Sequence, residues 1–222
     1  KKDIVLVFIE TDNGLIGVGE GWTPGASPKA LMQTIEEDVG PRLIGQDPRY
    51  HTKIFAEVWK TTALNARRGI LSIALSSVDL ALWDLVGKAL QTPVYQLLGA
   101  FTDQVPCYAS AGLYGKGKDE TALAEEMQGY LAQGFSDVKM KVGGVPLEED
   151  VKRVKAVRGA IGPRARLMVD ANYTLNVPKS LKMAQAFEPY EIYWLEAPVS
   201  PDDVSGQAKV NALSPIPVCG NE

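Results

Sequence analysis

The chain has 222 residues, of which 45% are hydrophobic and 23% are charged, a balance typical of soluble globular proteins. This length suits one large domain or two small ones. The formal net charge of −4 argues against nucleic acid or an anionic membrane surface as the partner, and it favours a small molecule.

The first hundred residues predict a small α+β domain. Residues 3–21 contain two apolar runs joined by a turn sequence, which is typical of a β-hairpin. A capping side chain followed by proline occurs at 27–28 and again at 47–48, and each pair predicts the start of a helix. Residues 69–90 are apolar around almost the whole helix circumference, so we expect a helix that is buried on several sides.

From about residue 105 the pattern changes to strands that alternate with amphipathic helices. The expected strands span 105–110, 136–142, 166–172, 192–198 and 216–222. The expected helices span 119–134, 148–160, 178–188 and 201–213. Strict alternation indicates parallel βα units, and no Gly-x-Gly-x-x-Gly motif opens the first unit to suggest a dinucleotide fold.

The expected fold is therefore α/β, with the first five strands of a TIM-type (β/α) barrel following the α+β domain. A complete barrel has eight strands and takes about 250 residues, so five strands cannot close it. We accordingly expect the chain to be a fragment of a longer protein.

The two cysteines, Cys107 and Cys219, sit in apolar stretches without the spacing of metal ligands. We expect both thiols to be buried and structural, which suits a reducing, cytoplasmic location. No membrane span is expected, because Asp79 and Asp84 interrupt the longest apolar run.

Polar side chains stand at the ends of four successive expected strands. They are Lys139 and Lys141, then Asp170 with Asn172, then Glu196, then Glu222. The intervals from 141 to 170, from 170 to 196 and from 196 to 222 are each one βα repeat long. Because the carboxyl ends of barrel strands form one active-site face, we expect these side chains to converge on one pocket.

Three carboxylates in one barrel mouth repel one another unless a cation compensates their charge. For any single acid, a surface charge or a helix cap is the more common explanation. Three acids at matching strand ends favour a metal site, and oxygen ligands favour Mg²⁺, or Mn²⁺ in its place. The expected ligands are Asp170, Glu196 and Glu222.

Lys139 and Lys141 lie two positions apart, which in a strand puts both ammonium groups on one face. An isolated Lys-x-Lys usually marks a solvated sheet edge. Beside a metal site, however, a second ammonium group favours the neutral, proton-accepting form of its neighbour. Lys141 is the expected base and Lys139 its partner, and the reaction expected of them is removal of the proton next to a metal-bound carboxylate.

Five motifs together resemble the enolase superfamily, and within it the mandelate racemase and muconate lactonizing enzyme family. They are SSVDLALWDLVGKALQTPVYQLLGA, VKMKVGG, MVDAN, WLEAP and IPVCGNE. The resemblance implies an N-terminal capping domain over 1–100, without its usual first strand, and the N-terminal part of a barrel domain over 101–222. It also implies that Lys141 is the general base, that Lys139 assists it, and that Asn172 contacts the lysines or the substrate.

The resemblance implies a Mg²⁺-dependent lyase or isomerase, either an acid-sugar dehydratase or a hydroxy-acid racemase. Glu222 as the third ligand resembles the mandelate racemase branch more than the muconate branch. The alternatives are a muconate-type cycloisomerase or dipeptide epimerase and, in another class, a non-catalytic protein that binds or assembles on this fold. The expected partners are a small carboxylate substrate and further copies of the chain, with neither nucleic acid nor membrane.

Overall fold

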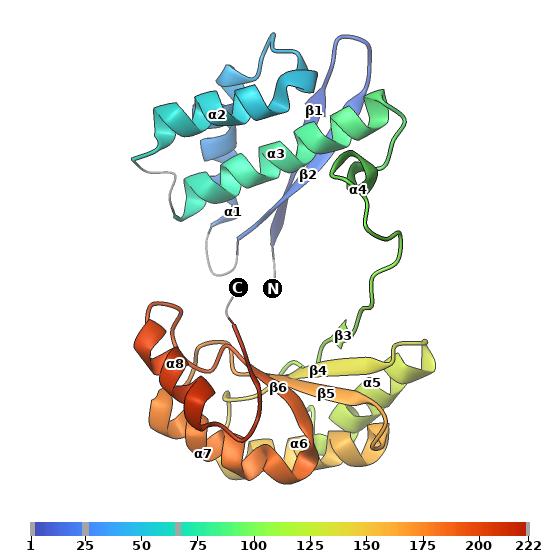
Figure 1. The fold of residues 1–222 in the computed structure, drawn as a ribbon, viewed down its shortest axis with the longest axis vertical. Helices are drawn as coiled ribbons and strands as arrows, with labels where there is room; N and C mark the ends of the chain where they lie inside the picture. Colours follow the sequence, from blue (N-terminus) through green and yellow to red (C-terminus); the bar gives the residue numbers. More distant parts are fainter. Residues whose placement is uncertain (1–2, 24–26, 65–67, 221–222) are drawn as a thin grey trace. The chain divides into compact units, whose positions relative to one another are not determined.

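The computed structural model describes residues 3–23, 27–64 and 68–220. The chain divides into two compact units, Lys1–Gln104 and Val105–Glu222 (Figure 1). Each unit has its own hydrophobic core. A separate core in each unit is what an independently packed domain requires.

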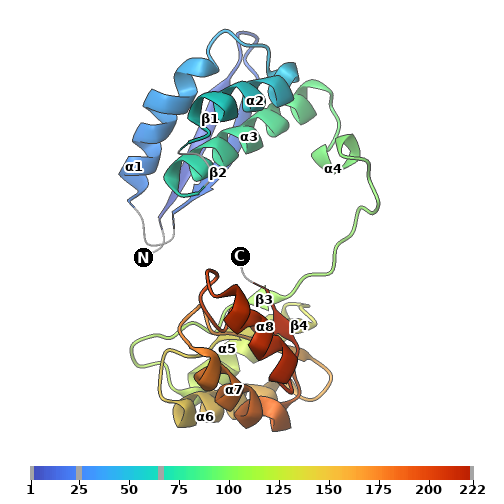
Figure 2. The same cartoon turned by 60° about the vertical axis from the view of Figure 1, so that its left-hand side comes forward.

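The first unit contains an antiparallel hairpin of strands β1 (Ile4–Glu10) and β2 (Ile16–Trp22). Its α-helices are α1 (Pro28–Gln33), α2 (His51–Thr62), α3 (Ile70–Ala89) and α4 (Val94–Leu97). A π-helical turn and two 3-10 turns connect α1 to α2, at Thr34–Val39, Gly40–Arg42 and Pro48–Tyr50. Helix α3 lies along one face of the hairpin, and α1 and α2 pack against α3 (Figure 2). The predicted α+β arrangement is therefore observed.

Glycine lets α3 lie unusually close to β2. A Cβ atom added at Gly19 would stand 1.9 Å from the Ser77 carbonyl oxygen on α3, a distance that no side chain tolerates. Among the described residues, α3 is also the helix whose length and hydropathy would suit a membrane span. Half of that span is buried in this core, as is common for the central helix of a globular domain.

The second unit is built on a parallel five-stranded sheet in the order β3-β4-β5-β6-β7. The strands are β3 (Ala109–Ser110), β4 (Asp137–Lys141), β5 (Arg166–Asp170), β6 (Ile192–Glu196) and β7 (Val218–Cys219). The helices between them are α5 (Glu120–Ala132), α6 (Leu147–Ile161), α7 (Val177–Phe187) with a 3-10 turn at Glu188–Tyr190, and α8 (Val204–Leu213). They lie on one side of the sheet (Figure 1). The predicted α/β fold with five parallel strands is confirmed.

Alternation along β4 separates the core from the polar face of the sheet. Val138 and Met140 are fully buried in the hydrophobic cluster that joins the strands to the helices. Because successive side chains point to opposite faces, Lys139 and Lys141 lie on the other face. That face therefore carries the candidate functional groups.

Two local predictions were wrong. The strand expected at 105–110 is reduced to Ala109–Ser110, because Pro106 lacks an N–H and Ala109 already pairs with Val138, one residue from the start of β4. The two cysteines were expected to be buried, but Cys107 is exposed and Cys219 is half-buried. Cys107 is exposed because it lies in the connection before β3. Helix α1 begins at Pro28 as predicted, although Ser27 makes no side-chain capping hydrogen bond.

Candidate active site

Strand register brings three predicted site residues together at the carboxyl end of the sheet. Lys141 is the register partner of Asp170, and Asp170 is the register partner of Glu196. Partners in a parallel ladder point to the same face, so the side chains meet above β4, β5 and β6. All of them belong to the second unit.

Lys139 is the more deeply buried of the two lysines. Its Nζ lies 2.6 Å from Glu196 Oε1, 3.5 Å from Asp170 Oδ2 and 5.5 Å from the centre of the Tyr108 ring. Burial alone would lower the pKa of Lys139, but the hydrogen bond to Glu196 and the charges of Glu196 and Asp170 outweigh it and raise the pKa. Lys139 is therefore a fixed positive charge between two carboxylates.

Lys141 carries the accessible amine. Its Nζ donates to Asp170 Oδ2 at 2.5 Å and to Asn172 Oδ1 at 2.8 Å. Its side chain is 22% exposed, compared with 9% for Lys139, so Lys141 is the lysine that a small molecule can reach.

The Asp170 carboxylate is shared by both lysines. Burial would raise the pKa of Asp170, but hydrogen bonds from Lys141 Nζ and from the Asn172 backbone N–H, together with the two ammonium charges, lower it. Asp170 is therefore ionised at neutral pH and can serve as a hard oxygen ligand.

Asn172 adopts a left-handed backbone conformation with φ of 48°. Tyr173 and Ala197, which follow β5 and β6, share this conformation with φ of 65° and 45°. Such angles are uncommon outside glycine and concentrate at functional sites, where the surrounding structure maintains them. Here the turn directs the Asn172 amide oxygen to Lys141.

Sequence reasoning missed the aromatic groups that support Glu196. Trp194 Nε1 donates to Glu196 Oε2 at 3.1 Å, and the Tyr108 ring meets the Trp194 ring edge-on at 5.7 Å. The spacing could have indicated Trp194, because it precedes Glu196 by two positions and therefore shares its face of β6. No comparable signal indicates Tyr108, which comes from a distant part of the sequence.

Glu222, the third predicted metal ligand, lies outside the described residues. Within the described ranges, no group of three or more His, Cys, Asp or Glu side chains is placed to hold a metal ion. Asp170 and Glu196 supply carboxylate oxygen donors on adjacent strands, a partial set that fits Mg²⁺.

Two family models match the chain. The mandelate racemase/muconate lactonizing enzyme N-terminal domain matches residues 1–99, and the enolase C-terminal domain-like model matches residues 122–222. The chain belongs to the mandelate racemase/muconate lactonizing enzyme family of the enolase superfamily. The resemblance stated from its motifs is confirmed.

Members of this family with different activities resemble the chain to a similar degree. Arabinonate dehydratase from Saccharolobus solfataricus is 34% identical over 99% of this chain, and D-galactarolactone cycloisomerase from Agrobacterium fabrum is 38% identical over 98%. The chain spans 59% and 57% of the lengths of these two enzymes.

A solved structure resembles the chain to a similar degree. The crystal structure of a racemase from Streptomyces coelicolor with bound magnesium is 34% identical, with a TM-score of 0.91. The match covers 99% of this chain and 61% of that one.

Proposed function

We propose that this chain carries the metal ligands and the base of a Mg²⁺-dependent enzyme that removes the proton α to a carboxylate. The observation that carries the proposal is the Lys141 amine, held by Asp170 and Asn172 yet 22% exposed. An amine fixed by two acceptors at an accessible strand end suits a general base.

The metal part of the proposal rests on the donor set. Asp170 and Glu196 would hold Mg²⁺ together with Glu222, and Mn²⁺ is the expected substitute. The bound metal would stabilise the negative charge that develops on the substrate carboxylate. The magnesium in the S. coelicolor racemase supports this choice of metal.

In the proposed proton transfer, the lone pair of Lys141 Nζ accepts the α-proton and the electron pair of the C–H bond remains on the substrate. Lys139 stays charged, because the hydrogen bond to Glu196 and the charges of Glu196 and Asp170 outweigh its burial and raise its pKa. Asn172 Oδ1 orients the Lys141 amine throughout. The proton then returns to the substrate or passes to solvent.

We infer an acid-sugar dehydratase as the first outcome and a hydroxy-acid racemase as the second. Arabinonate dehydratase supports the first, and the S. coelicolor racemase supports the second. Both start with the same α-proton removal, so the residues described above serve either.

Cycloisomerization is the competing reaction, and the 38% identity to D-galactarolactone cycloisomerase favours it. Product analysis separates the three outcomes: a dehydratase releases water, a racemase inverts one centre, and a cycloisomerase rearranges a ring without net loss of atoms. After incubation of the intact protein with a panel of sugar acids and lactones, mass spectrometry detects the loss of water. NMR and chiral chromatography distinguish inversion of a centre from rearrangement of a ring.

The test of the base is solvent exchange of the substrate α-proton. The intact protein in D₂O should incorporate deuterium at the α-carbon of its substrate, and Lys141→Ala should lower that rate by about 10²- to 10⁴-fold. Lys209→Ala, which removes an exposed lysine of α8, is the matched control and should leave the rate unchanged. Equal exchange in Lys141→Ala and the unaltered protein would rule out this base.

A non-catalytic role is the alternative from another class. It would be favoured if the unaltered protein binds sugar acids but exchanges no α-proton in any of them.

A further inference from the structure

A buried ionic network lies directly behind the strand end that carries Lys141. Its centre is Asp150, a fully buried residue in the first turn of α6. Asp150 Oδ1 accepts from Tyr114 Oη at 2.8 Å and from Arg153 Nη1 at 2.7 Å, and Oδ2 accepts from the Gly143 N–H at 2.6 Å. A buried carboxylate with three donors is well compensated and holds its partners in one arrangement.

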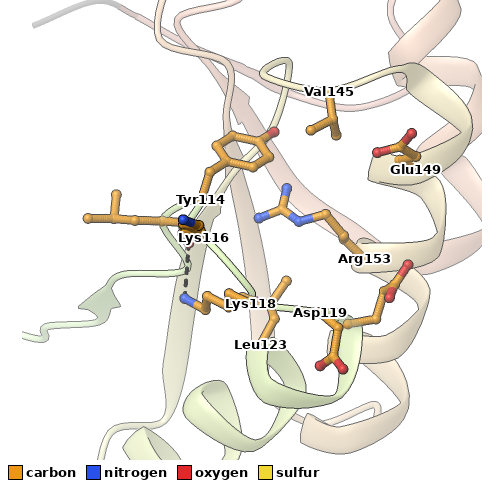
Figure 3. A pocket seen from close by; sticks show the side chains of 11 residues that line it. Tyr114, Lys116, Lys118, Asp119, Leu123, Val145, Glu149 and Arg153 are labelled. Atoms are coloured by element: carbon orange, nitrogen blue, oxygen red, sulfur yellow. Dashed lines mark hydrogen bonds between the residues drawn. The ribbon is translucent and has the colours of Figure 1, made fainter.

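Arg153 links this network to the main chain of β4 and of the segment that follows β3. Its Nη1 donates to the Lys141 carbonyl oxygen at 2.9 Å, and its Nη2 donates to the Gly112 carbonyl oxygen at 3.3 Å. Its guanidinium carbon lies 4.0 Å from the centre of the Tyr114 ring. Figure 3 shows Tyr114 and Arg153 side by side. The planar guanidinium thus bridges the carboxyl ends of β3 and β4.

The chain geometry explains why a side chain performs this task. Lys141 N donates to Gly112 O at 3.3 Å, so the main-chain groups of Lys141 face the β3 side. At Gly112 the chain turns away with φ of 62°, and a Cβ there would stand 2.3 Å from Met127 Cε. Arg153 Nη1 takes the place of a strand N–H for the Lys141 carbonyl.

The space beside the network makes the contact between Arg153 and the Lys141 carbonyl sensitive to truncation of Arg153. A pocket of about 480 Å³ adjoins Tyr114 and Arg153, between the loop before α5 and the first turns of α6 (Figure 3). If Arg153 were truncated, neighbouring groups could not close tightly around the strand end, because open space already lies on that side. Burial raises the pKa of Tyr114 to about 12, so its hydroxyl remains a donor to Asp150 at neutral pH.

We propose that Arg153 and Asp150 are positioning residues for Lys141: they fix the main chain of the base-bearing strand end and thereby the direction of its amine. The inference rests on the proposed function for its catalytic consequence. Among the described residues, their hydrogen-bond partners are each other, main-chain carbonyls, an N–H and Tyr114, and not the side chains proposed to bind substrate. A misplacement of about 1 Å can cost a proton transfer on the order of 10²-fold.

A matched control exists at the opposite end of the same strand. Asp137, the first residue of β4, pairs with Arg166, with Nη2 2.5 Å from Oδ2, and accepts from the Arg166 N–H at 3.0 Å. This pair also combines a buried carboxylate with an arginine, but it lies at the amino end, away from Lys141. Loss of this pair should cost stability without moving the amine.

The experiment compares Arg153→Met with Arg166→Met in the intact protein. The first readout is the rate at which a water-soluble acylating reagent modifies Lys141, measured by peptide mass spectrometry relative to Lys209. Arg153→Met should increase this ratio several-fold, because the amine leaves Asp170 and Asn172 more often, and Arg166→Met should leave it unchanged. The second readout is turnover: Arg153→Met should lower kcat by about 10- to 100-fold with KM nearly constant.

Two further variants address folding and specificity. Arg153→Lys retains the positive charge but cannot donate to the Lys141 and Gly112 carbonyls together, so its kcat should lie between those of Arg153→Met and the unaltered protein. Tyr114→Phe keeps the ring and removes the hydroxyl that donates to Asp150. It should increase Lys141 labelling, but less than Arg153→Met does. If Arg153→Met does not fold, Tyr114→Phe decides the question by itself.

The outcomes test the positioning role of Arg153 and Asp150 separately from the proposed function. Unchanged Lys141 labelling in both Arg153→Met and Tyr114→Phe would overturn the positioning role. If labelling rises as expected while the unaltered protein exchanges no substrate proton, the positioning role stands and the proposed function fails.

Discussion

At the scale of single residues, the candidate site depends on one carboxylate shared by two amines. Asp170 Oδ2 lies 2.5 Å from Lys141 Nζ and 3.5 Å from Lys139 Nζ, and Asp170 itself is buried. Buried charges persist only when they are paired, so neither lysine can be altered without affecting the other. Mutations here should consequently be non-additive.

Substitutions at Asn172 separate the loss of its hydrogen bond with Lys141 from the effect of backbone strain. Asn172→Gly and Asn172→Ala both remove the amide oxygen that accepts from Lys141, so both should lower the α-proton exchange rate similarly. Only alanine is strained at φ of 48°, and it should cost about 1 kcal/mol of unfolding free energy more than glycine. Urea unfolding and exchange in D₂O measure the two effects. Exchange that is lost in one variant only would contradict the role assigned to the amide oxygen.

Asp137 gives a pH-dependent prediction away from the site. Hydrogen bonding from Arg166, the largest cause, lowers the pKa of Asp137 to about 2 from its ordinary 3.8. A carboxyl whose pKa is lower in the folded state stabilises the fold at pH values above its ordinary pKa. That stabilisation is lost as the pH falls through the folded-state pKa.

Asp137→Asn should therefore cost about 1 to 2 kcal/mol at pH 7, a range reduced because Arg166 is half exposed. The difference from the unaltered protein should shrink as pH falls from about 4 towards 2. Urea titrations at a series of pH values measure it. A difference that stays constant across this range would show that the ion pair is not its source.

At the scale of elements, the sequence allowed the polar face of the sheet to be predicted. Period-two alternation placed Lys139 and Lys141 on one face, and repeat-length spacing placed Asp170 and Glu196 beside them. These are local rules, and each strand obeys them independently of its neighbours. Helix ranges within the barrel part were also close to those observed.

Contacts between distant residues could not be predicted from a single sequence. Tyr114 and Asp150 are 36 positions apart, and nothing in either local segment indicates that they meet. The shortness of β3 is likewise a tertiary result, because register with β4 leaves residues before Ala109 almost nothing to pair with. The exposure of Cys107 follows from the same missing strand.

The packing of α3 on β2 makes a third prediction. Gly19→Ala should destabilise the protein by about 3 kcal/mol or more, because its Cβ would overlap the Ser77 carbonyl oxygen. Gly14→Ala is the matched control: its backbone has φ of 82°, but nothing lies within 4 Å of its Cβ position, so only conformational strain of about 1 kcal/mol is expected. Thermal unfolding of both variants compares them. Equal losses would show that close approach to α3 is unimportant.

At the scale of the whole molecule, the candidate site residues described come from one unit. Lys139, Lys141, Asp170, Asn172 and Glu196 all lie in Val105–Glu222, whose larger part matches the enolase C-terminal domain-like model. Relatives with dehydratase, cycloisomerase and racemase names match the chain at similar identity. The comparisons therefore do not select one of these reactions, and our proposal for this chain is limited to α-proton removal with the outcomes named above.

The most direct test of the central claim is a Mg²⁺ titration of the intact protein by calorimetry. The claim is that carboxylates on consecutive strands hold a divalent cation beside Lys141. The unaltered protein should bind Mg²⁺, Glu196→Gln should weaken binding by about 100-fold or more, and Glu191→Gln, which removes the carboxylate of the turn before β6, should have no effect. Equal Mg²⁺ affinity in Glu196→Gln and the unaltered protein would contradict the account.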